Sequence, residues 1–436
     1  MKFTTRILNQ AKYQKKYVEY RNYPEIDFKT DKRSGGVAYD MANQTGGTEG
    51  MGDMEENNPQ KKLHHLFDFY HPQMQNRTVS CLDWNPANTD LLAATYGEYE
   101  LTPIGKDLDK LQGMLAFWTL KNPEFPERII KTSSRAISCK FSPRNPNLIG
   151  VGMYDGVVAI YDIRKKGDQP IADSKELDTK HLDAVWEVDW VGKGSGNDKR
   201  EGLISISSDG KIIEWSIKKG LESQELKVLN RVTNPNPVPS TLKTDKSDTI
   251  NFRYTAGFSF NFLPGDNSTY FTSTEDGTIH HCSKTYKDQY YNNYFGHTGP
   301  VYKVRVNPFW TDVFLSCSAD WSCRIWNWRE DQSKYTLRNL DLFDEVFDIE
   351  WSPYCSTLFA STAKDGRLEL WDLQKKSLDP IYVDWYGMSK QIKDVTYPAR
   401  TCVKFNPKDP VVVTGNVEGK ISVYRLQDYE SRKWFN

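Results

Sequence analysis

Six acidic residues recur at regular intervals along the chain, and isolated carboxylates of this kind could serve as general acids or bases. They are Asp155, Asp209, Asp276, Asp320, Asp365 and Glu418. All but Asp320 are followed by Gly, and each stands between two short apolar segments. An Asp-Gly pair in that setting is a strong hairpin signal in which both central residues are expected at positive φ. Because one acid occurs in each repeat, we interpret them as structural turn residues and not as a catalytic group.

Other residues capable of chemistry do not form a recognisable site. His280 and His281 are adjacent in a predicted strand, so they point to opposite faces and do not suit one metal ion. His64, His65 and His71 lie close together in the sequence without a ligand pattern. The chain has no Gly-x-Ser-x-Gly elbow, no phosphate-binding Gly-rich loop ending in Lys-Ser/Thr and no His-Glu-x-x-His. We predict no enzymatic activity, no cofactor and no metal.

The acids belong to a longer repeat that occurs about seven times between Thr78 and Leu426. The clearest copy contains the apolar segments Ala136–Phe141, Leu148–Gly152 and Val158–Tyr161. A repeat of this size cannot bury its own apolar faces, so it must pack against neighbouring copies. Two of the intervals between acids match the period of WD repeats, about 40–45 residues. We predict an all-β, seven-bladed WD-repeat β-propeller over residues 63–436.

Closure of the ring requires one strand from outside the repeats. About ten residues follow the last predicted strand, which leaves the seventh blade without a fourth strand. The alternating segment Leu66–Tyr70 precedes the first repeat and has no other assignment. We predict that it pairs with the seventh blade and removes an exposed edge. The alternative is an isolated strand or loop.

Residues 1–62 differ from the repeats and form an N-terminal arm. Tyr13, Tyr17, Tyr20 and Tyr23 fall on one face of a predicted helix. They could form a partner-binding surface or hold the arm against the propeller. Ser34–Gln60 is rich in Gly, Asn and Met and is expected to be disordered or draped on another surface.

Composition narrows the class of partner. The net charge of −1 argues against a nucleic-acid or anionic-membrane surface. No run of about 18 apolar residues is present, and the N-terminus lacks the apolar core of a signal peptide. Seven cysteines without a Cys-x-x-Cys are typical of reduced thiols in a cytosolic protein.

Aromatic residues near the ends of the predicted strands are the candidates for partner binding, because aromatic side chains make strong interface anchors. They are Tyr154, Trp186, Trp321 and Phe347, with Phe309 and Trp310 in a connecting turn. The alternative is that each packs between blades.

Six segments are more specific than generic WD repeats. They are Gly113–Glu127, Tyr154–Tyr161, His181–Trp190, Ser207–Trp215, Asn307–Trp321 and Trp351–Ala360. These segments resemble axonemal outer-arm dynein intermediate chains. His297 also matches the Gly-His position of WD repeats and is expected to hydrogen-bond within its blade. The resemblance implies a scaffold whose propeller binds the tail of a dynein heavy chain beside a second intermediate chain. It also implies attachment to doublet microtubules through the complex. The location that it implies is the cytoplasm and cytoskeleton, in the axoneme of a cilium or flagellum.

The resemblance further implies light-chain binding N-terminal to the propeller, here limited to residues 12–33. The alternative function is a generic WD-repeat adaptor that recognises a peptide, such as a substrate receptor. A positively charged central mouth would favour that alternative.

Overall fold

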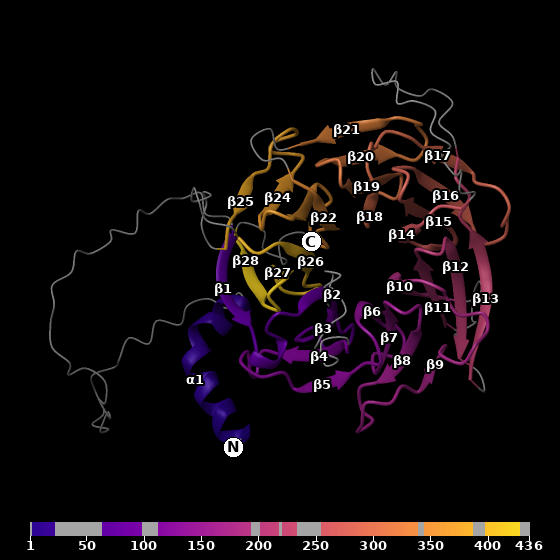
Figure 1. Cartoon of the computed structure of the whole chain (residues 1–436). Coiled ribbons are helices and arrows are strands. Elements are labelled where there is room, and N and C mark those ends of the chain that lie inside the picture. The colour runs from indigo at the N-terminus through magenta and orange to yellow at the C-terminus, as the bar shows by residue number, and fades with distance from the viewer. Residues whose placement is uncertain are drawn as a thin grey trace, which may run out of the picture.

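The protein is a ring of seven blades, each a four-stranded antiparallel sheet (Figure 1). The computed structural model describes residues 2–21, 63–97, 112–192, 201–217, 220–232, 254–338, 344–386 and 397–427. The seven-bladed β-propeller predicted from the repeats is confirmed. The segment 34–60 and Tyr23 lie outside the described residues.

In blades 1–6 the strands follow one another from the centre of the ring outward. Blades 1, 2 and 3 are β2 (Thr78–Trp84), β3 (Leu91–Gly97), β4 (Met114–Thr119), β5 (Arg128–Lys131); β6 (Ala136–Phe141), β7 (Leu148–Met153), β8 (Val158–Asp162), β9 (Ala172–Asp173); and β10 (Val185–Gly192), β11 (Glu201–Ser207), β12 (Lys211–Ile217), β13 (Leu221–Val228). Blades 4, 5 and 6 are β14 (Gly257–Leu263), β15 (Asp266–Thr274), β16 (Ile279–Ser283), β17 (Asn292–Tyr294); β18 (Val301–Val306), β19 (Val313–Ser318), β20 (Cys323–Asn327), β21 (Ser333–Leu337); and β22 (Val346–Trp351), β23 (Leu358–Ala363), β24 (Leu368–Asp372), β25 (Tyr382–Asp384).

The seventh blade joins the two ends of the repeat region. It contains β26 (Arg400–Phe405), β27 (Val411–Asn416), β28 (Ile421–Leu426) and the N-terminal strand β1 (Leu63–Phe69). β1 pairs antiparallel with β28, from Leu63 opposite Leu426 to Phe69 opposite Ile421. It begins three residues before the segment expected to close the ring. A short 3-10 helix, η1 (Pro72–Met74), then leads into β2.

The hairpin turns differ from the expected geometry. The glycines have φ between 78° and 89°, whereas none of the turn acids has positive φ. In blade 2 the Gly156 N–H donates to the Met153 carbonyl (3.4 Å) and the Met153 N–H donates to the Val157 carbonyl (2.9 Å). This is a type I turn followed by one left-handed residue, so a single positive φ is enough and the expectation for the acid was wrong.

The turn acids instead hold the turns through their side chains. Asp155, Asp209, Asp320 and Asp365 each accept a hydrogen bond from the backbone N–H two residues later, at 2.9–3.3 Å. Asp276 forms an ion pair with Arg231 (2.6 Å). These contacts account for the Asp at each of these five turns without assigning it any chemistry.

The N-terminal helix α1 (Lys2–Tyr20) packs against the outside of the seventh blade (Figure 1). The rings of Tyr13, Tyr17 and Tyr20 each lie about 6 Å from the ring of Phe67 on β1. Of the two interpretations of the tyrosine face, this arrangement favours an arm resting on the propeller. None of the helices in the described ranges combines the length and apolarity that crossing a bilayer requires.

The C-terminal end of α1 spans the junction between blade 7 and blade 1. Tyr20 is fully buried, and its hydroxyl accepts a hydrogen bond from the amide of Asn406 in the β26–β27 turn (2.9 Å). Arg21 pairs with Asp90 in the β2–β3 turn and lies 3.8 Å from Asp409. The helix therefore reinforces the one junction where the N- and C-terminal parts of the repeat region meet.

We expect Tyr20→Ala to lower the free energy of unfolding by about 3 kcal/mol, because it removes a buried ring and a buried hydrogen bond. Chemical denaturation measures the loss, and limited proteolysis reports release of α1. Lys15→Ala on the exposed face of the same helix is the matched control and should change stability little. Equal stability of the two variants would show that α1 does not reinforce the junction.

Candidate functional site

Each of the seven inner strands has a β-bulge at its second or third residue, next to the mouth of the central channel. The pairing register shifts across the residues Ser80, Ile137, Trp186, Phe258, Tyr302, Phe347 and Thr401. A bulge redirects a side chain away from the regular alternation of a strand. All seven redirected residues line the same cavity, whose volume is about 850 Å³. We call them the bulge ring.

The bulge ring is aromatic on one side only. Blades 3 to 6 supply Trp186, Phe258, Tyr302 and Phe347, which we call the aromatic arc. Neighbouring ring centroids are 5.6, 6.0 and 5.8 Å apart along the arc. All four side chains are partly exposed. Edge-to-face and tilted contacts of this kind hold the rings in place, so the arc offers a preformed apolar surface.

Blades 7 and 1 leave the opposite side of the ring small and polar. Ser80 donates to the carbonyl of Ala136 in blade 2 (2.7 Å), and Thr401 donates to the carbonyl of Val79 in blade 1. These hydroxyl groups are hydrogen-bonded to the backbone of the next blade, so the two short side chains do not project far into the mouth. The mouth is therefore asymmetric, with an apolar wall over four blades and a low polar edge over two.

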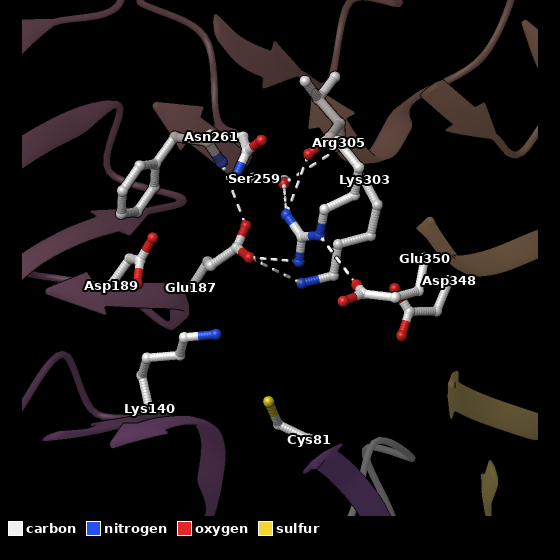
Figure 2. Close-up of polar contacts among 12 residues, drawn as sticks. Cys81, Lys140, Glu187, Asp189, Ser259, Asn261, Lys303, Arg305, Asp348 and Glu350 are labelled. Carbon is white, nitrogen blue, oxygen red and sulfur yellow. Dashed lines mark hydrogen bonds and ion pairs between the residues drawn. The ribbon is translucent and has the colours of Figure 1, made fainter. Parts of the chain in front are cut away.

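Below the mouth, charged side chains cross the channel in pairs (Figure 2). The Arg305 guanidinium lies between Glu187 (2.6 Å) and Glu350 (3.5 Å). Further ion pairs join Lys303 to Glu187 (3.6 Å), Lys404 to Glu350 (2.6 Å) and Lys140 to Asp83 (3.2 Å). Each of these cations has a carboxylate partner, so the channel does not form the positively charged mouth that would favour a peptide receptor.

The acceptors in the channel also satisfy the open edge of the inner strands. Side chains of one inner strand accept hydrogen bonds from backbone N–H groups of the next. The pairs are Asp83 with Phe141 (2.8 Å), Glu187 with Phe260 (3.1 Å), Ser259 with Val304 (3.2 Å), Asn261 with Val306 (2.8 Å) and Asp348 with Val403 (2.9 Å). A buried N–H without an acceptor is costly, so these polar side chains have a structural task.

The pKa of Glu187 fits a permanently charged structural group. Burial alone would raise its pKa, but the adjacent Arg305 and Lys303 outweigh burial and lower it to about 2. A carboxyl with so low a pKa does not release or take up protons near neutral pH. Glu187 is therefore unsuited to general acid–base chemistry.

Two blades contain a Ser-His-Asp arrangement that resembles a catalytic triad. In blade 5, His297 contacts Asp320 (2.9 Å) and Ser316 (2.7 Å), and Trp326 donates to the same serine oxygen (2.8 Å). His181, Asp209, Ser205 and Trp215 repeat this pattern in blade 3. Ser316 and Ser205 are fully buried between strands, where no substrate could reach the hydroxyl. The histidines thus connect the hairpin turns to the blades, as expected for His297.

The predicted partner-binding aromatics lie on two different faces. Trp186 and Phe347 belong to the arc, and the turns carrying Tyr154 and Trp321 reach the same face. The Tyr154 N–H donates to the Arg135 carbonyl just before β6, and the Ala319 N–H to the Pro300 carbonyl just before β18. Tyr154 and Trp321 are 38% and 47% exposed.

Phe309 and Trp310 occupy the β18–β19 turn, at the opposite end of blade 5 from Trp321. They are 52% and 63% exposed. The side-chain oxygen Oδ1 of Asn307 accepts hydrogen bonds from both backbone N–H groups, at 2.9 and 3.0 Å, which holds the turn. The turn lies on the face where Asn406 binds Tyr20 of α1. The six candidates therefore do not form one surface.

Phe258 and Tyr302 belong to the arc but were not predicted. A signal was present, because each follows the first residue of an inner strand, as Trp186 and Phe347 do. An alignment of the seven repeats at the second residue of each inner strand would have identified all four residues of the aromatic arc. The bulge itself is not visible in the sequence.

His280 and His281 point to opposite faces of β16, as expected. His280 stacks on Tyr290 with ring centroids 4.1 Å apart, and His281 stacks on Phe271 at 4.6 Å. Burial lowers the pKa of each histidine to about 4. Within the described residues no group of three potential ligands surrounds a metal position.

Comparisons with known proteins match most of the chain. Residues 61–188 match the family described as "Dynein axonemal intermediate chain 3 WD40 domain", and residues 288–327 match "WD domain, G-beta repeat". Dynein axonemal intermediate chain 4 of Mus musculus is 39% identical over 369 residues, which is 84% of this chain and 44% of that protein. The Xenopus laevis protein of the same name is 34% identical over 93% of this chain and 52% of its own.

A further relative is the "Dynein, 78 kDa intermediate chain, flagellar outer arm" of Chlamydomonas reinhardtii. It is 32% identical over 83% of this chain and 50% of its own length. The chain thus spans about half the length of the curated relatives that it matches.

We expect the free energy of unfolding to fall as the pH drops from 6.5 toward 5. The unfolded chain takes up protons on His280 and His281 below their ordinary pKa of 6.5, whereas the folded protein resists until about 4. Urea unfolding across this range measures the slope. His281→Phe should reduce this slope, because it removes one of the two imidazoles that take up protons on unfolding. The substitution loses no hydrogen bond at Nε2 of His281, which is buried without a hydrogen-bond partner. A flat profile above pH 5 would contradict this assignment.

Trp321 occupies the position of the turn glycine of blades 2, 3, 4, 6 and 7 and has a φ of 65°. We expect Trp321→Gly to be more stable than Trp321→Ala by about 1 kcal/mol, because only glycine adopts this conformation without strain. The two variants lose the same indole, so thermal unfolding compares the backbone alone. Greater stability of the alanine variant would show that the turn is not strained.

Proposed function

Because this chain is homologous to the dynein axonemal intermediate chains over most of its length, we propose that it is a non-catalytic subunit of an axonemal dynein motor complex. The identity of 39% over 84% of the chain is the observation that carries the proposal. It agrees with the resemblance drawn from the repeat motifs. The location that follows is the axoneme of a cilium or flagellum.

Within the complex, we propose that the arc face binds the tail of the heavy chain. The arc supplies four aromatic side chains on a rigid ring, and exposed Tyr154 and Trp321 extend the same face outward. Aromatic clusters of this type are enriched among interface hot spots. The low polar edge over blades 7 and 1 leaves room for a rod-like partner to leave the mouth.

The opposite face is proposed to contact the second intermediate chain. Phe309 and Trp310 are exposed there and are held by Asn307. Attachment to the doublet microtubule, in the outer arm as the motifs imply, would then occur through the assembled complex. We do not assign light-chain binding to α1, because three of its tyrosines contact Phe67 of this chain.

The alternative of a peptide-binding adaptor receives less support. Among the described residues, the channel cations Lys140, Lys303, Arg305 and Lys404 are all paired with carboxylates, so these four are not free to bind an acidic peptide. An enzymatic role is not supported either, because the Ser-His-Asp arrangements are buried.

The test is affinity capture of the tagged chain from ciliary extract, washed at high salt, with quantitative mass spectrometry. We expect a dynein heavy chain and a second intermediate chain to be retained. Trp186→Ala combined with Tyr302→Ala should reduce heavy-chain recovery at least about tenfold, since hot-spot truncations cost about 2 kcal/mol or more. Phe309→Ala combined with Trp310→Ala is the matched control on the other face and should leave heavy-chain recovery unchanged.

Equal heavy-chain recovery with both double variants would reject the arc as the binding surface. Recovery of a ubiquitin ligase in place of dynein subunits would reject the scaffold role and support the adaptor. Thermal unfolding of each variant must match the parent chain, so that a loss of binding is not a loss of folding.

A further inference from the structure

Two cysteines from neighbouring blades meet in the wall of the central channel. Cys81 on β2 and Cys139 on β6 both line the cavity, and Figure 2 shows the sulfur of Cys81 pointing into it. The Cys81 thiol lies 3.6 Å from the backbone carbonyl of Cys139. Cys81 is partly exposed, whereas Cys139 is buried.

The surroundings of Cys81 favour its thiolate. The adjacent Cys139 side chain, together with the positive charge of Lys303, lowers the pKa of Cys81 to about 7, although burial opposes this shift. The same interaction raises the pKa of Cys139 well above its ordinary value. One sulfur of the pair is therefore prepared to attack, and the other remains a thiol beside it.

We propose that Cys81 and Cys139 are a hydroperoxide-sensitive thiol pair, which oxidises to a disulfide that cross-links blade 1 to blade 2. The Cys81 thiolate attacks one oxygen of hydrogen peroxide, so that an S–O bond forms, the O–O bond breaks and hydroxide leaves as water after protonation. Cys139 then attacks the sulfur of this sulfenic acid, the S–S bond forms, and a second water leaves. Two thiols and one peroxide give one disulfide and two waters.

The location connects this chemistry to the mouth of the channel. Cys81 directly follows Ser80 of the bulge ring, and Cys139 lies two residues after Ile137. The cross-link would therefore fix the two inner strands beneath the edge where the arc ends. A partner bound at the mouth would cover the cavity and shield the pair from oxidant.

The chain contains a second cysteine pair that serves as an internal control. Cys317 on β19 stands directly opposite Cys323 on β20. Both are buried, neither lines the channel cavity, and burial raises the pKa of each thiol far above its ordinary value. The two residues of this pair are also neighbours, but neither thiol lines the channel cavity and neither has a lowered pKa.

The experiment treats the full chain with hydrogen peroxide at pH 7, blocks free thiols by alkylation and maps peptides by mass spectrometry. We expect a Cys81–Cys139 cross-linked peptide to form at least about tenfold faster than oxidation at Cys317 or Cys323. Cys139→Ser should instead accumulate a Cys81 sulfenic acid that dimedone traps. Cys81→Ser should abolish both products while the protein stays folded.

Three outcomes would overturn the proposal. The first is a cross-link between Cys81 and Cys402, the other cysteine lining the cavity. The second is oxidation of Cys317 and Cys323 at the same rate as Cys81. The third is an unreacted Cys81 in a chain whose Cys139→Ser variant also traps no sulfenic acid.

Discussion

The open edges of the seven inner strands impose the constraint on which the rest of the structure depends. Each inner strand is paired on one side only, so its other edge of N–H groups faces the channel. Those groups are satisfied by side chains of the preceding blade, such as Asp83, Glu187 and Asp348. Buried carboxylates in turn require neighbouring cations, because an unpaired buried charge is far more costly than a paired one. The charged channel follows from the propeller and not from a ligand.

The same constraint separates the interior of the channel from its mouth. The charged side chains of the inner strands form ion pairs inside the channel, whereas the bulges near the first residue of each strand redirect seven side chains at the mouth. Blades 3 to 6 have aromatic residues at these positions. Blades 1 and 7 have Ser80 and Thr401, whose hydroxyl groups bind the backbone of the next blade. An apolar docking surface can thus exist on a ring whose channel contains a network of ion pairs.

Much of this arrangement could be predicted from periodicity, because a repeat that cannot bury itself permits few folds. The seven blades and the structural nature of the turn acids follow from patterns within about ten residues. The arrangement of the aromatic residues at the mouth of the channel cannot be predicted in this way. Trp186 and Phe258 become neighbours only after two strands from different blades are bulged at equivalent positions. The positive φ at Trp321, and not at Asp320, likewise depends on a turn type that the residue pair does not specify.

Blade 4 shows how the constraint is met where the repeat is most degenerate. Its inner strand has Ser259 and Asn261 at positions where blades 3 and 6 have acidic residues. These neutral side chains still accept the N–H groups of Val304 and Val306 in blade 5. With no carboxylate in between, Arg305 of blade 5 reaches across to Glu187 of blade 3 and donates to Ser259 on the way (3.4 Å). Without acidic residues in blade 4, the ion pair therefore joins blade 5 directly to blade 3. The ring stays closed, and blade 4 contributes Phe258 to the arc.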